Sequence, residues 1–229
     1  MTRIVLFGGI MAVVAAGLMS EAVKAVPSLP FYDSADFTPH WTRISAHHIA
    51  DFSLVTQDGV TITRNDVLGK VHIASFIYTR CAGICPAMVT QLAKVQKAIA
   101  GRDAWLVSYS VTPQDDTPES LAAFATMRGI DSDRWKLVTG DPEQIYGLAR
   151  TSYFADDGRL ETGKAATEQF LHTEKALLVD REGRLRGVYN ATLPHDIDKL
   201  IADLEALLET YRRSDPIRRS YLERMTSQR

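Results

Sequence analysis

Between Val71 and Gly101 a strand-like run of residues passes directly into a helix-like run. Residues 71–78, VHIASFIY, are nearly all β-branched, aromatic or small, which is typical of a strand buried on both faces of a sheet. After TRCAGICP, apolar residues recur at helical spacing, at Met88, Leu92, Val95 and Ile99. A buried strand followed by an amphipathic helix predicts a layered α/β fold.

The rest of the chain continues this alternation. We expect further strands over 105–111, 134–139, 176–179 and 185–189, and further helices over 116–127, 142–153 and 194–211. Residues 51–63 turn at Asp58-Gly59 and residues 176–189 turn at Asp180–Gly183, so each segment predicts a hairpin. This order predicts a thioredoxin-like fold, with a central mixed sheet flanked by helices and an N-terminal hairpin extension that covers one sheet edge.

Length and composition set the domain boundaries. A chain of 229 residues is expected to form one domain with short extensions, and we assign the domain to residues 51–212. Residues 26–50 are rich in Pro, aromatic and polar residues and predict an extended linker, while residues 213–229 form a basic tail. The 26 Lys and Arg residues are balanced by 28 Asp and Glu residues, which argues against nucleic-acid binding.

Residues 1–25 have the pattern of an export signal. Arg3 precedes an apolar run from Ile4 to Met19, which small residues follow. This run is slightly shorter than the range of about 17–25 residues for a membrane-spanning helix, so the segment is either a signal peptide or a retained anchor. The charged Glu21 and Lys24 make a poor cleavage region and favour retention. We expect an exported domain in the bacterial periplasm, tethered to the inner membrane.

Cys81 and Cys85, the two cysteines of the chain, lie between the buried strand and its helix, with Pro86 in the first helical turn. The positive end of the helix favours the thiolate, which both disulfide exchange and copper binding require. A structural disulfide would close a very short loop and stabilise the fold little. Dithiol oxidoreductases of this fold typically have two residues between their cysteines. The three found here, including Gly83, favour a metal site without excluding a disulfide.

A site with two sulfur ligands needs a third donor, and six histidines are available. His172 directly precedes a predicted strand and follows a long polar stretch, residues 155–169, where functional loops are often found. From position alone it remains one candidate, and a surface role is the simpler interpretation. The other five lie in or near the linker, at the start of the buried strand or at the start of the last helix: His40, His47, His48, His72 and His195.

The segment FIYTRCAGICPAM resembles the copper motif of the Sco/SenC family, and the similarity extends over about residues 51–208. The matching positions of the motif are Thr79, Cys81, Cys85 and Pro86, and the similarity continues through SVTPQDDTPESL, WKLVTGDPEQI and FLHTEKALLVDREGRLRGVY. The resemblance implies a thioredoxin-like fold and one copper ion, Cu(I) or Cu(II), bound by Cys81, Cys85 and His172. It also implies delivery of copper to the binuclear copper site of cytochrome c oxidase subunit II, or reduction of that site's cysteines.

Two residues depart from the family pattern. Thr112 stands where relatives commonly have Asp before Pro, and Leu171 stands where they commonly have an acidic residue before the histidine. The second change removes a carboxylate that could orient the imidazole, so copper affinity is expected to differ from that of relatives. Asp115 and Asp116 could compensate, although a role at the start of a helix is the simpler interpretation.

Three other functions stay open. A thiol-disulfide reductase would use Cys81 to attack and Cys85 to resolve, without need of His172. A peroxiredoxin-like peroxidase is disfavoured because no Pro precedes the Thr79–Cys81 motif. A purely structural domain would retain its stability and support oxidase assembly without either cysteine. Other exported copper chaperones or thiol-disulfide oxidoreductases are further expected partners.

Overall fold

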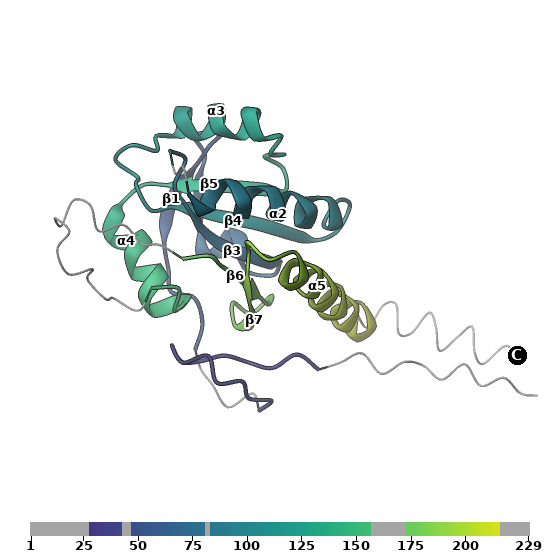
Figure 1. Cartoon of the computed structure of the whole chain (residues 1–229). Helices are drawn as coiled ribbons and strands as arrows, with labels where there is room; N and C mark the ends of the chain where they lie inside the picture. Colours follow the sequence, from purple (N-terminus) through teal and green to yellow (C-terminus); the bar gives the residue numbers. More distant parts are fainter. Residues whose placement is uncertain (1–27, 43–46, 81–82, 157–172, 216–229) are drawn as a thin grey trace, which may run out of the picture.

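A seven-stranded mixed sheet forms the centre of the molecule (Figure 1). The computed structural model describes residues 28–42, 47–80, 83–156 and 173–215. The strand order is β2-β1-β5-β4-β3-β6-β7. The strands are β1 Ser53–Thr56, β2 Thr61–Thr63, β3 Val71–Ile77, β4 Ala104–Ser110, β5 Trp135–Thr139, β6 Lys175–Val179 and β7 Leu185–Asn190.

The three central strands are parallel and the outer four are antiparallel. β3 pairs with β4, and β4 with β5, in parallel register. β1 and β2 form the predicted N-terminal hairpin, which extends the sheet beyond β5. β6 and β7 form the second predicted hairpin, and β6 pairs with β3. Every residue of β3 is buried, which confirms the interpretation of VHIASFIY as a central strand.

Helices cover both faces of the sheet. Helices α2, α3 and α5 pack on one face, and α4 packs on the other (Figure 1). They are α1 Arg64–Val67, α2 Ile84–Ala98, α3 Pro118–Arg128, α4 Pro142–Gly147 and α5 Pro194–Ser214. This arrangement is the predicted thioredoxin-like fold. Among the described residues, which begin at Ser28, the helices are too short or too polar to span a bilayer.

The helices differ from the sequence prediction in two places. The helix expected over residues 142–153 changes after Gly147 into a π-helical turn, Leu148–Ser152. Its Leu148 and Ala149 still contribute to the core, so the apolar pattern is satisfied by a wider turn. The single-turn helix α1 was not predicted, because four residues are too few to show helical periodicity.

The segment expected to be an extended linker packs against the domain over its described residues. Leu29, Phe31 and Ile49 are buried, and Tyr32 forms a bridge with Leu185 on β7. The guanidinium of Arg186 donates hydrogen bonds to the carbonyl oxygens of Leu29 and Pro30 at 2.6 and 2.9 Å. The packing depends on contacts distant in sequence, which explains why the segment shows no regular periodicity.

Gly187 on β7 is required because Tyr189 folds back over it. A Cβ atom at this position would lie 2.1 Å from the Tyr189 hydroxyl oxygen and 2.5 Å from Cζ. That hydroxyl donates a 2.8 Å hydrogen bond to Asp203 on α5, which ties the sheet to the helix. We expect Gly187→Ala to lower the free energy of unfolding by about 1–3 kcal/mol, because Tyr189 must move.

Urea denaturation would measure this change, with Gly147→Ala as the matched control. Gly147 has helical backbone angles and open space around its Cα, so alanine there should be neutral or stabilise the protein by up to about 1 kcal/mol. Equal stabilities for the two variants would mean that Tyr189 moves aside without loss.

Candidate metal centre

Cys85 lies in the first turn of α2, directly beyond the end of β3. It is the second residue of the helix, and its side chain is buried at 8% exposure. The first four amide N–H groups of a helix have no acceptor within the helix, and Pro86 has no N–H, so three such groups remain for other acceptors at the start of α2. The position of Cys85 where β3 leads into α2 confirms the predicted place of the second cysteine. Cys81 and His172, the other two predicted ligands, lie outside the described residues.

Several segments meet at the end of the sheet where Cys85 lies. β3 and β4 both end there because they are parallel, and their last residues, Ile77 and Ser110, are paired. β6 runs antiparallel to β3, so it begins at the same end, just after the buried Thr173. Helices α2, α3 and α5 also begin there. This end of the sheet is therefore surrounded by helix N-termini, which favour anionic groups such as thiolates.

A buried carboxylate connects the two loops at this end. Asp116 is fully buried and lies between β4 and α3. Its carboxylate accepts hydrogen bonds from the hydroxyl and the backbone amide of Thr79, which follows β3. It also accepts from the hydroxyls of Ser110 and Thr112, at 2.6 and 3.2 Å. The loop that leads to the first cysteine is thus joined to the neighbouring loop through one side chain.

This role of Asp116 is not expected from the sequence. The sequence pattern places the residue at the start of a helix, whereas the N-cap of α3 is Thr117, whose hydroxyl accepts from the Ser120 amide. The usable signal was a group of polar residues directly after a buried strand, at Ser110 and Thr112. The neighbouring Asp115 instead makes a longer, more exposed ion pair with Arg80, at 3.9 Å.

The five described histidines occupy different environments. His72 on β3 is fully buried, and His195 in the first turn of α5 is exposed at the same end of the sheet as Cys85. The other three contact Asp33 or backbone carbonyl oxygens and lie in the N-terminal segment, which comprises the described residues 28–42 and 47–50: His40, His47 and His48. The described part of the chain, which omits Cys81 and His172, contains no cluster of three or more His, Cys, Asp or Glu side chains suited to a metal.

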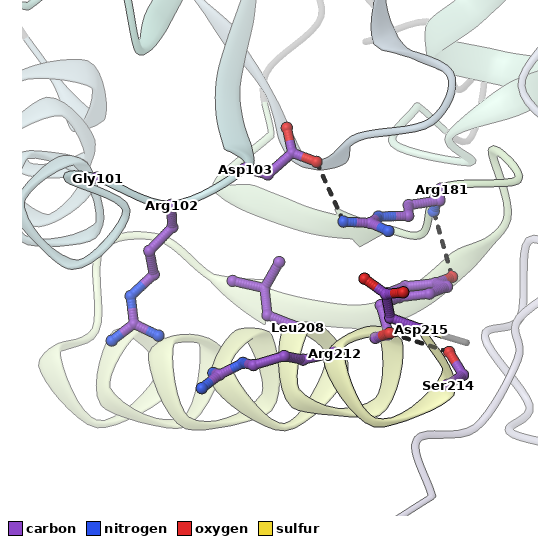
Figure 2. Close-up of a pocket in the computed structure, with 9 residues that line it drawn as sticks. Gly101, Arg102, Asp103, Arg181, Leu208, Arg212, Ser214 and Asp215 are labelled. Atoms are coloured by element: carbon purple, nitrogen blue, oxygen red, sulfur yellow. Dashed lines mark hydrogen bonds and ion pairs between the residues drawn. The ribbon is translucent and has the colours of Figure 1, made fainter. Parts of the chain in front are cut away.

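A cleft of about 750 Å³ lies at the opposite end of the sheet, between the start of β4 and the end of α5 (Figure 2). Its walls carry three arginines, each paired with a carboxylate. The pairs are Arg102–Glu205 at 3.0 Å, Arg181–Asp103 at 3.1 Å and Arg212–Glu209 at 3.0 Å. Because these positive charges are already compensated, the cleft is better explained as a packing feature of α5 than as an anion site.

Comparison with known proteins agrees with the resemblance seen in the sequence. The SCO1/SenC family model matches residues 42–209. The SCO1 protein homolog of Bacillus subtilis is 28% identical over 163 residues, which cover 70% of this chain and 82% of that protein.

Two solved structures extend this comparison. BsSco, described as a member of the Sco family of cytochrome c oxidase assembly proteins with a disulfide switch, superposes with a TM-score of 0.60 at 27% identity. The match covers 71% of this chain and 94% of BsSco. Bradyrhizobium japonicum ScoI, solved with copper bound, gives a TM-score of 0.56 at 25% identity and covers 71% of this chain and all of that one. With the family model spanning most of its length and the thioredoxin-like sheet in place, the chain belongs to the SCO1/SenC family.

Proposed function

We propose that the chain binds one copper ion through Cys81, Cys85 and His172 and delivers it to the binuclear copper site of cytochrome c oxidase subunit II. The observation that carries the proposal is the position of Cys85, in the first turn of α2 at the end of β3, in a member of a family with a copper-bound relative. Two thiolates and an imidazole are ligands that copper prefers.

The described neighbours of the other two ligands support this assignment. Arg80 and Gly83 flank the Cys81 segment between β3 and α2, and Thr173, directly after His172 in the chain, is buried next to the start of β6. β3 and β6 are paired, so these segments share one end of the sheet. A site with three protein ligands leaves copper accessible to the thiolates of a partner, which can take it by ligand exchange.

Copper titration of the reduced protein under anaerobic conditions tests the proposal. The wild type should bind one equivalent, with thiolate-to-copper absorption for Cu(II). Cys81→Ser, Cys85→Ser and His172→Ala should each weaken binding by more than about 100-fold, because loss of a ligand exceeds the effect of outer-shell changes. His195→Ala, an exposed histidine at the same end of the sheet, should bind as the wild type does. Undiminished binding by His172→Ala would refute the three-ligand site.

A thiol-disulfide oxidoreductase is the second candidate, since the similar BsSco is described as having a disulfide switch. In this function Cys81 and Cys85 would reduce the cysteines of the oxidase copper site or of other exported proteins. Turnover of a disulfide substrate that survives His172→Ala but not Cys81→Ser would favour it over delivery.

The location of the protein forms part of the same proposal. The basic and apolar pattern of residues 1–25 supports an exported domain on the periplasmic side of the inner membrane, where oxidase subunit II and exported copper chaperones or oxidoreductases would be its partners. Fractionation of cells, followed by sequencing of the mature N-terminus, distinguishes a retained anchor from a cleaved signal.

A further inference from the structure

We infer that Asp116 is a positioning residue: by fixing Thr79 it sets where the chain leaves β3 toward Cys81, and so helps both cysteines to act together. The inference rests on the proposed function of Cys81 and Cys85, and it adds a residue to which that function assigns no role. Asp116 acts through Thr79, which lies two residues before Cys81 in the chain.

The hydrogen bonds of Asp116 suit this role. Thr79 donates twice to the carboxylate, once from its hydroxyl to Oδ1 and once from its amide to Oδ2 at 3.4 Å. These two bonds fix both the side chain and the backbone of Thr79. Oδ2 also accepts hydrogen bonds from the hydroxyls of Ser110 and Thr112, and these bonds anchor the carboxylate to the end of β4.

The surroundings of Asp116 explain why a carboxylate is needed to accept all of these hydrogen bonds. The side chain is fully buried, and the ion pairs found among the described residues do not include it. Its oxygens instead accept from one backbone amide and three hydroxyls, and each hydroxyl can rotate toward them. A neutral amide presents one oxygen and an NH2 group, so the side chain could no longer accept at both positions.

The connection between the two loops is also supported by the backbone. The amide of Val111 donates to the carbonyl oxygen of Ile77 at 2.9 Å, and β3 and β4 are paired up to their last residues. Beyond Ile77 this pairing ends, and the Thr79–Asp116 bonds continue the connection toward the cysteines. Loss of Asp116 should therefore free the loop while leaving the sheet intact.

Two variants test the connection from each side. Asp116→Asn and Thr79→Val should each lower copper affinity about 10–100-fold, the range expected when a group that orients ligands is removed. Thr79→Ser retains the hydroxyl and should restore affinity to near the wild-type value. Asp115→Asn, which alters the neighbouring, more exposed carboxylate, should change affinity less than about threefold.

A stability control separates positioning from folding. Ser75 on β3 is buried and shares a 2.7 Å hydrogen bond with Ser108, on the same pair of strands but away from the cysteine loop. Ser75→Ala should lower the melting temperature to a similar extent as Thr79→Val, yet leave copper affinity unchanged. If Ser75→Ala weakens copper binding as much as Thr79→Val does, the positioning role is refuted.

A second readout does not depend on copper. In a glutathione buffer the Cys81 and Cys85 thiols are oxidised to a disulfide as one glutathione disulfide is reduced to two thiols, and the equilibrium reports the geometry of the pair. Asp116→Asn should shift this equilibrium at least about threefold relative to the wild type and Asp115→Asn. A wild type that binds no copper would refute the proposed delivery, while this shift would still support the positioning role. Unchanged copper affinity and an unchanged disulfide equilibrium in Asp116→Asn would refute the role of Asp116 alone.

Discussion

Replacing Asp180 by alanine should lower the free energy of unfolding by about 3–5 kcal/mol, the cost typical of leaving a buried charge unpaired. The Asp180 carboxylate is fully buried and accepts from Arg184 Nε at 2.9 Å and from Arg186 Nη1 at 3.2 Å. It also accepts from the amides of Glu182 and Arg184, which closes the turn between β6 and β7. Without it, the Arg186 side chain, at 9% exposure, retains its charge in a buried position.

Denaturant unfolding of Asp180→Ala and Asp103→Ala would check this expectation. Asp103 pairs with Arg181 at 3.1 Å, but the two side chains are 57% and 35% exposed, so its removal should cost less than about 1 kcal/mol. Because Arg186 also binds the carbonyl oxygens of Leu29 and Pro30, the Asp180 variant should lose protection of the N-terminal segment from hydrogen exchange. A similar small cost in both variants would show that water compensates Arg186.

Acidification should destabilise the protein through His72, by up to about 3 kcal/mol between pH 6.5 and 4. Burial in β3 lowers the pKa of His72 from 6.5 to about 4, although the Lys70 backbone weakly opposes this shift. Neither ring nitrogen makes a well-formed hydrogen bond with the described residues, and the Lys70 backbone contact only partly offsets burial, so a proton there would carry a poorly compensated charge into the sheet. The unfolded chain therefore binds a proton that the folded chain excludes. The contribution of neutral His72 to the free energy of unfolding is therefore complete above about pH 6.5 and is lost as the pH falls toward 4.

The free energy of unfolding, measured at intervals from pH 7.5 to 4, tests the role of His72. His72→Phe, which keeps a ring between Trp105 and Val179, should remove up to about 3 kcal/mol of this pH dependence. The exposed His195→Gln variant should retain the wild-type slope. If His72→Phe loses stability with acid as steeply as the wild type does, other groups cause the acid response.

The sheet could be predicted because its strands have strong local signals. The buried run at Val71–Ile77 and the turns at Asp58-Gly59 and Asp180–Gly183 each depend on neighbouring residues, and the structure confirms them. The N-terminal segment could not be predicted in the same way. Phe31 and Ile49 become buried only because Arg186 and Leu185 on β7 supply the partners.

Only part of the candidate site could be predicted, because some of its residues belong to local patterns and others act through contacts distant in sequence. The Cys85 position follows from a strand-to-helix pattern that lies within a few residues, and the structure places it as expected. Asp116 acts on Thr79 across 37 positions of sequence, and no local pattern indicates that these side chains meet. Cys81 and His172 stay predictions that rest on the family motif and on the described residues beside them.

The N-terminal segment also affects how the protein meets other chains. A sheet edge with free backbone groups can pair with a strand of another molecule and start aggregation. Here β2, at one edge, has three residues, and the bridge from Tyr32 to Leu185 occupies the start of β7 at the other. The open edges are therefore the three residues of β2 and the part of β7 beyond Leu185, which is less backbone for strand addition than an uncovered β7 would offer.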